Sequence, residues 1–238
     1  SEDFPQDAKF MVDYYRLECL EDYNDRTIAE KMNLGNEKEA KAGPRSKVLW
    51  IRGLYDDLYV IDKAVKSAMP DAEITKKYQR EMPKGAADLA AYGTIIMPNV
   101  PVEGMGVELR KAFRGWTLAG GHLVILGGDY SLGQGLMRGT FLEEVLPCVL
   151  RRNDDVVKLP EKSRMEIAGA ASEDGGRLYY AHVTEARPDA EIFAKTGSIP
   201  LLMTHSAGKG RCTVFAGTVL GAPKDDPEAF WNGKAWLE

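Results

Sequence analysis

GGHLVILGGDYSLGQG, residues 120–135, carries the clearest signal of the fold. Its middle, residues 122–126 (HLVIL), is an apolar run of the kind found in strands that are covered on both faces. A glycine-rich turn, residues 127–135, follows at once. In an open α/β sheet the turn after such a strand lies at the carboxyl edge, where ligands bind. We therefore expect a parallel sheet with a candidate binding site in this turn.

Short apolar strands alternate with helices on the amino-terminal side of this stretch. Residues 47–51 (KVLWI), 72–78 and 94–97 (TIIM) are predicted strands. Residues 58–69 and 107–118 are predicted helices, because apolar side chains recur there at helical spacing. The alternation predicts an α/β fold in which helices cover both faces of a parallel sheet.

The last third of the chain has a stronger strand pattern. The candidate strands are residues 178–183, 190–195, 199–206 and 212–217. The sequence AGKG, residues 207–210, lies between the last two and predicts a hairpin with a four-residue loop. Such a hairpin places His205 opposite Cys212. We therefore expect a β-rich C-terminal section.

The first 43 residues are predicted to form a helical N-terminal arm, and residues 44–238 the main domain. Apolar side chains recur at helical spacing in the arm: Phe10, Met11, Tyr14, Tyr15 and Leu17. Asn24 or Asp25 is the expected cap of a second helix. Residues 36–44 (NEKEAKAGP) have the polar composition of a linker. We expect the apolar stripe, rather than ion pairs, to hold the arm in place.

Composition excludes several classes of protein. The 238 residues are 44% hydrophobic and 28% charged, and no apolar run approaches the roughly 18 residues of a membrane span, so we expect a globular chain. Of the 31 basic and 36 acidic side chains, 6 and 11 lie in the arm, which leaves the main domain neutral. Because nucleic acids bind basic surfaces, we expect no nucleic-acid partner.

The spacing of cysteine, histidine and glycine residues indicates neither a metal nor a cofactor. Cys19, Cys148 and Cys212 are far apart and form no C-x-x-C pair, which argues against a disulfide framework and a zinc site. The histidines, His122, His182 and His205, each stand alone, and we expect His122 to bond backbone. The glycines after residue 127 miss the dinucleotide-binding spacing. The sequence leaves the compartment open.

Three stretches resemble a known family. ADLAAYGTIIMPNVP (87–101), GGHLVILGGDYSLGQGLMRGTFLEEVLPC (120–148) and IPLLMTHSAGKGRCTVFAG (199–217) resemble, in that order, the class I glutamine amidotransferase-like domains of uncharacterised bacterial proteins. The resemblance implies a flavodoxin-like fold, related distantly to ThuA-like proteins. It covers about residues 46–238 and does not cover the arm.

The nucleophile that this resemblance implies is missing. In the true amidotransferases a cysteine on a strand-to-helix elbow attacks glutamine. The matching elbow, residues 126–131 (LGGDYS), has no cysteine, so we expect no glutaminase activity. A pair of Cys212 and His205 is the remaining geometric option. A cysteine within a β-strand is, however, more often a small core residue.

Polar and glycine residues at the expected carboxyl edge form the candidate ligand site. They are Arg52, Asn99, Gly127, Gly128, Asp129, Tyr130 and Ser131. Glycines let backbone N–H groups approach a ligand closely, and the polar side chains after neighbouring strands converge at one edge. The alternative is that these residues only make a tight turn. Asp56 and Asp57 also lie at this edge, where we expect them to cap the following helix.

The sequence favours a non-catalytic, degenerate amidotransferase-like module with a binding or scaffolding role in a larger protein. The chain ends in FWNGKAWLE, residues 230–238, which suggests the first turns of an amphipathic helix and an excised domain. The alternative is a hydrolase or isomerase that acts on a sugar-like molecule at the former elbow. The open partners are a small-molecule ligand, a second copy of the chain, or other domains of a longer parent chain.

Overall fold

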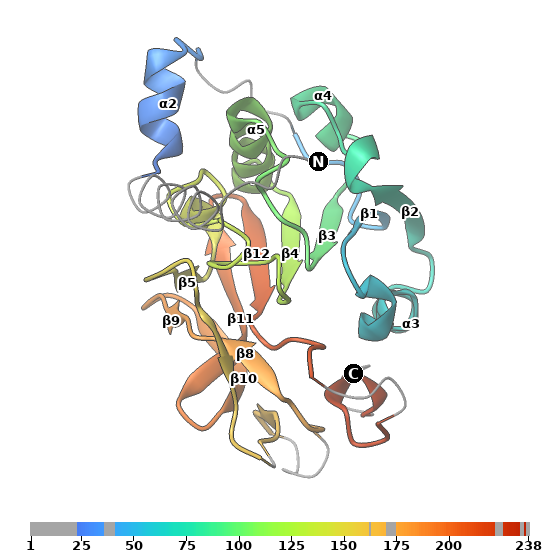
Figure 1. Cartoon of the computed structure of the whole chain (residues 1–238). Helices are drawn as coiled ribbons and strands as arrows, with labels where there is room; N and C mark the ends of the chain where they lie inside the picture. The colour runs from blue at the N-terminus through green and yellow to red at the C-terminus, as the bar shows by residue number, and fades with distance from the viewer. Residues whose placement is uncertain are drawn as a thin grey trace, which may run out of the picture.

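An eight-stranded sheet forms the centre of the protein in the computed structural model, which describes residues 23–35, 41–161, 163–169, 175–221, 226–233 and 236. The strand order is β2-β1-β3-β4-β12-β11-β10-β7 (Figure 1). The five parallel strands are β1 (Lys47–Arg52), β2 (Glu73–Tyr78), β3 (Thr94–Pro98), β4 (His122–Leu126) and β12 (Gly210–Phe215). The antiparallel ones are β11 (Ile199–Ala207), β10 (Glu191–Thr196) and β7 (Glu166–Ile167). The α/β fold is therefore confirmed, whereas the parallel arrangement holds for five of the eight strands.

The hairpin between β11 and β12 is the place where the sheet changes from parallel to antiparallel pairing. Only Gly208 and Lys209 separate β11 from β12, so the loop is two residues shorter than the four predicted. Gly208 has a positive φ of 60°, and a Cβ there would lie 2.6 Å from the Leu118 carbonyl oxygen, which explains the glycine. His205 lies opposite Cys212, as the sequence predicts. The connection is too short for a parallel crossover, so β11 runs against β12.

Side chains of the parallel strands alternate between two cores, one on each face of the sheet. On β1, Leu49 belongs to the core that includes Phe113 of α5 (Val107–Leu118). Its neighbour Trp50 belongs to the core that includes Val65 of α3 (Ile61–Ala68). Helices thus lie on both faces. The predicted β3 and β4 are parallel to each other, and β3 is buried along its whole length.

The observed bounds of α5 agree with the predicted ones, whereas those of the helix predicted at residues 58–69 do not. α5 spans the residues predicted for it. The helix expected at residues 58–69 divides into a 3-10 turn, η1 (Asp56–Tyr59), and α3, because Val60 between them has a positive φ of 46°. The remaining short elements are η2 (Gln79–Glu81), α4 (Ala86–Leu89), η3 (Glu143–Val145), and the strand pairs β5 (Cys148–Val149) with β9 (Glu185–Ala186) and β6 (Val156–Lys158) with β8 (Tyr180–His182).

The arm contributes one described helix, α2 (Asp25–Lys31), which packs beside α5 (Figure 1). Asn24 caps it, accepting from the backbone N–H groups of Arg26 and Thr27, as predicted. Asp25 forms a buried ion pair with Arg110 of α5, at 2.6 Å. The apolar stripe at residues 10–17 and the linker residues 36–40 lie outside the described residues. In its described part, the arm docks through this buried ion pair, and the role of the apolar stripe stays a prediction.

A 3-10 turn, η4 (Phe230–Asn232), packs onto the sheet near the end of the chain. It lies at the start of the predicted amphipathic helix, of which residues 234, 235, 237 and 238 lie outside the described residues. Phe230 and Trp231 are buried in the same core as Trp50. None of the helices in the described ranges has the length and apolar character that would let it cross a membrane.

Candidate functional site

The glycine-rich turn after β4 does not form a strand-to-helix elbow. Residues 127–142 run through a series of turns, and the next helical element is the short η3. A nucleophile elbow requires a helix directly after the turn. The expectation of an elbow at residues 126–131 is therefore wrong for this chain in its geometry, in addition to the missing cysteine.

Asn99, in the loop after β3, hydrogen-bonds the loops that follow β1 and β4. Its Nδ2 donates to the Leu54 carbonyl after β1 at 2.9 Å, and its Oδ1 accepts from the Tyr130 backbone N–H at 2.7 Å. Gly128 has a φ of +148°, and a Cβ there would lie 2.2 Å from Asn99 Cγ. The glycine therefore lets the asparagine side chain pass between the loops. Because Asn99 is fully buried, it positions the loops and does not face a ligand.

A buried pair, Asp155 and His182, forms hydrogen bonds with the backbone of the glycine-rich turn. Asp155 Oδ1 lies 2.8 Å from His182 Nδ1 and accepts from the Gln134 N–H, and its Oδ2 accepts from the Gly133 N–H. His182 Nε2 lies 3.1 Å from the backbone nitrogen and oxygen of Gly128. Both side chains are inaccessible to solvent. The pair therefore fixes the turn instead of facing the surface.

Sequence reasoning missed this pair because its members are far apart in the chain. His182 lies in β8, 27 residues after Asp155 and 54 after Gly128. No motif spacing links them. The available signal is indirect: a buried glycine-rich turn exposes several backbone N–H groups that need acceptors, and a carboxylate is the strongest side-chain acceptor.

Ser131 is buried beneath the turn. Its Oγ finds no hydrogen-bond partner within the described part of the chain. His182 makes its bonds to Gly128 and Asp155, so the serine and the histidine are not paired as a nucleophile and its base.

An open groove of about 720 Å³ lies at the carboxyl ends of β1 and β2. Its lining residues are Arg52, Gly53, Leu54, Tyr78, Gln79, Arg80, Pro101 and Tyr130. They come from four loops that meet at this edge of the sheet, after β1, β2, β3 and β4. The volume lies within the roughly 300 to 1,000 Å³ of small-molecule sites.

Arg52 is held in a fixed position on one wall of this groove. Its guanidinium donates to both carboxylate oxygens of the buried Asp56, at 2.8 and 2.9 Å, and to Asp57 at 2.8 Å. The hydrogen bond to Asp56 and the charges of both aspartates raise the pKa of Arg52. Both aspartates lie inside the 3-10 turn η1, and neither η1 nor α3 has a side-chain cap, so the predicted capping role is wrong. The carboxylates serve instead to orient the arginine.

Tyr78, the last residue of β2, is the cross-strand neighbour of Arg52 and contacts two arginines. The guanidinium carbon of Arg52 is 5.4 Å from the centre of its ring, and that of Arg80 is 5.6 Å away. Tyr78 and Tyr130 are each about half exposed, at 52% and 48%. The groove therefore presents guanidinium groups and open tyrosine rings together.

The structure separates the predicted site residues into two groups. Arg52 and Tyr130 line the groove, while Asn99, Gly127, Gly128 and Ser131 are buried behind it. Asp129 is half-buried and does not line the groove. Tyr78, Gln79 and Arg80, at the end of β2, are groove residues that the sequence analysis did not single out.

The cysteines of the described chain, Cys148 and Cys212, are buried. Burial raises the pKa of the Cys148 thiol to about 12 and raises that of Cys212 well above its usual value. His205 uses its ring nitrogens on the Val145 carbonyl, at 2.8 Å, and on Asp189, at 3.3 Å. The side chains of His205 and Cys212 therefore do not form a nucleophilic pair, although the two residues face each other in the sheet.

His122 bonds a side chain and not the backbone as expected. Its Nε2 lies 2.9 Å from Thr213 Oγ1 on the neighbouring β12. Burial, assisted by the charges of Arg45 and Arg211, lowers the pKa of His122 to about 4. His122 is therefore neutral at physiological pH.

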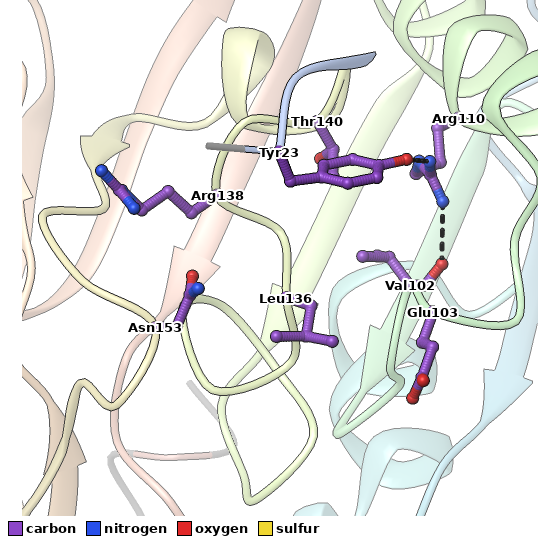
Figure 2. A pocket seen from close by; sticks show the side chains of 8 residues that line it. All are labelled: Tyr23, Val102, Glu103, Arg110, Leu136, Arg138, Thr140 and Asn153. Carbon is purple, nitrogen blue, oxygen red and sulfur yellow. Dashed lines mark hydrogen bonds between the residues drawn. The ribbon is translucent and has the colours of Figure 1, made fainter. Parts of the chain in front are cut away.

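A second, smaller cavity of about 110 Å³ lies between the arm and the loops that follow β3 and β4 (Figure 2). The ring of Tyr23 crosses it and hydrogen-bonds Arg110, which also donates to the Val102 carbonyl. Burial is the main cause that raises the pKa of Tyr23 to about 12. Because this wall is the docking contact of α2, the cavity belongs to the arm interface.

In neither cavity, nor elsewhere among the described residues, do three His, Cys, Asp or Glu side chains gather to hold a metal ion.

The comparisons with known proteins agree on the fold alone. No protein-family model and no curated protein sequence matches the chain. Two cytoplasmic proteins of Salmonella typhimurium are similar in structure. STM3548 has a TM-score of 0.66 and STM1381 one of 0.62, each at 18% identity over 80% of this chain and over 94% and 95% of theirs. A ThuA-like protein from Bacteroides uniformis has a TM-score of 0.48, with 14% identity over 86% of this chain and 91% of that one.

Proposed function

We propose that the protein is a non-catalytic, class I glutamine amidotransferase-like module that binds a small molecule in the groove at the carboxyl edge of its sheet. Two features support the family resemblance. The five parallel strands have the order β2-β1-β3-β4-β12, which corresponds to the 2-1-3-4-5 order of flavodoxin-like sheets. The three stretches of sequence that resemble the family supply β3, β4, β11 and β12.

The observation that carries the binding proposal is the convergence of four loops on one groove. Open α/β sheets bind ligands outside the carboxyl ends of their strands, and this groove lies there. Two parts of its walls are held by hydrogen bonds, because Asp56 orients the Arg52 side chain and Asn99 holds the backbone of Tyr130. A site whose side chains are already in position loses less entropy on binding.

The same residues argue against catalysis at the former elbow. Amidotransfer needs a thiolate beside oxyanion donors, and the turn offers Gly128, Asp129 and Tyr130 there. The alternative, a hydrolase or isomerase for sugar-like molecules, needs a proton-transfer group that is open to the groove. The histidine nearest the turn, His182, is buried and bonded on both nitrogens. Binding is therefore the simpler proposal.

The proposal is tested by thermal-shift screening of the whole chain with sugars, carboxylic acids, phosphates and amides. We expect at least one compound to raise Tm in the natural protein and to lose this effect in Tyr130→Ala, which opens one wall of the groove. Phe193→Ala is the matched control, since Phe193 is an equally exposed aromatic residue on β10, away from the groove.

Two outcomes would overturn the proposal. One is a screen without hits, and the other is a set of hits that Tyr130→Ala leaves unchanged. Ammonia release from glutamine, assayed alongside, should stay at the level of buffer. Release that Cys212→Ala abolishes would show that the strand cysteine has taken over the role of nucleophile.

A further inference from the structure

Two arginines lie in the groove, and their surroundings differ. Among the described residues that line it, Arg52 and Arg80 carry a charge and none carries a carboxylate. Asp56 and Asp57 behind the wall more than offset the charge of Arg52. Arg80 is exposed, and within the described ranges its recorded contact is with the Tyr78 ring and not with a carboxylate. Arg80 is therefore the cation that remains available to an anion.

Aromatic surface lies next to this cation. Tyr78 is the last residue of β2, and Tyr130 comes from the glycine-rich turn, so the two rings reach the groove from different elements. Exposed tyrosine rings offer a flat apolar face together with a hydroxyl group. Gln79, between Tyr78 and Arg80, adds an amide that can both donate and accept hydrogen bonds.

From this combination we infer that the ligand of the groove is a small acidic ring compound, whose carboxylate or phosphate binds Arg80 and whose ring lies against Tyr78 and Tyr130. The inference rests on the proposed function and names the class of ligand. A guanidinium suits both anions, because its parallel N–H groups match two oxygens at once. Arg52, held by Asp56, shapes the wall beside the anion and supplies less of the net charge.

Isothermal titration of the whole chain tests this inference with defined probes. Glucuronate and a hexose phosphate are the acidic sugars, and hydroxybenzoate is an acidic aromatic ring. Glucose is the neutral ring, and inorganic phosphate is the anion without a ring. We expect at least one acidic ring compound to bind about tenfold or more tightly than glucose and than inorganic phosphate, since a charge-assisted bond and a ring contact each contribute about this factor.

Two variants assign the effect to Arg80. Arg80→Gln should weaken the binding of the acidic ring compound by about tenfold or more. Arg45→Gln is the matched control, because Arg45 is also exposed but precedes β1, at the opposite edge of the sheet, and it should leave binding unchanged.

The outcomes separate this inference from the proposed function. Equal binding of glucose and the acidic sugars, or full affinity in Arg80→Gln, would overturn the acidic ligand while leaving a binding groove. Equal binding of inorganic phosphate and the hexose phosphate would overturn the role of the ring. If no acidic ring compound binds at millimolar concentration, the inference is wrong, and the proposed function falls only if the broader screen also finds nothing.

Discussion

At the residue scale, the candidate site depends on polar side chains that hold backbone and do not touch solvent. Asp155 satisfies the N–H groups of Gly133 and Gln134 and orients His182, which in turn contacts Gly128. A buried carboxylate that accepts several bonds is costly to remove, because each donor is left without a partner in a place that water does not reach. The shape of the glycine-rich turn thus depends on one aspartate.

We predict that Asp155→Ala lowers the free energy of unfolding by about 3 kcal/mol, because it leaves two backbone donors and His182 unpaired. Urea unfolding measures the change. The neighbouring Asp154→Ala is the control and should cost less than about 1 kcal/mol, since Asp154 is exposed and pairs with Arg152 at the surface. Similar losses in the two variants would contradict the account of Asp155.

His122 gives the molecule a pH dependence of known sign. Its pKa is about 6.5 in the unfolded chain and about 4 in the folded one, so the folded state binds the proton less readily. The free energy of unfolding is therefore highest above pH 6.5, where His122 is neutral in both states. It falls by up to about 3 kcal/mol as the pH drops toward 4, because the unfolded chain takes up the proton first. Unfolding measured from pH 7 to pH 4 should therefore fall more steeply in the natural protein than in His122→Gln. Parallel curves would show that His122 does not contribute.

At the scale of secondary structure elements, the sequence predicted those parts whose signal is local. β4 and α5 have the predicted bounds, because an apolar run and a helical apolar stripe are each read within a dozen residues. The pairing of His205 with Cys212 followed from one short hairpin loop. The interior of the turn at residues 127–142 could not be predicted, since its partners, Asp155 and His182, come from another part of the chain.

The docking of α2 on α5 includes a buried ion pair that the sequence analysis did not predict. Asp25 accepts from Arg110 and from the Phe141 N–H, and its own N–H donates to the Gly139 carbonyl. Both charged side chains are almost wholly buried, at 1% and 5% exposed. Salt screens buried pairs weakly, so the contact should persist at high ionic strength.

We predict that Asp25→Ala releases α2, because it leaves the Arg110 guanidinium buried without its counter-ion, at a cost of about 3 to 5 kcal/mol. Hydrogen exchange should become faster in α2 and around Phe141. Asp62→Ala, which removes an exposed ion pair with Lys76, is the control and should change exchange in neither place. Unchanged protection of α2 in Asp25→Ala would mean that other contacts hold the arm.

At the scale of the whole molecule, one sheet joins a parallel half to an antiparallel half. β12 pairs with β4 on one side and with β11 on the other, so the C-terminal hairpin extends the parallel sheet (Figure 1). The sequence pattern predicted the parallel strands and the C-terminal hairpin. It did not predict that β12 pairs with β4, because strand pairing between distant segments leaves no local signal. The groove lies at the far end of the strand order, beside β1 and β2, where the antiparallel half does not cover the carboxyl edge.

An NMR titration of backbone amides, with the compound that raises Tm most in the screen, shows whether this groove binds a small molecule without transforming it. We predict shifts centred on Leu54, Gln79, Arg80 and Tyr130, and recovery of the compound unchanged. Shifts centred on the hairpin at Gly208 and Lys209, or conversion of the compound to a product, would contradict the claim.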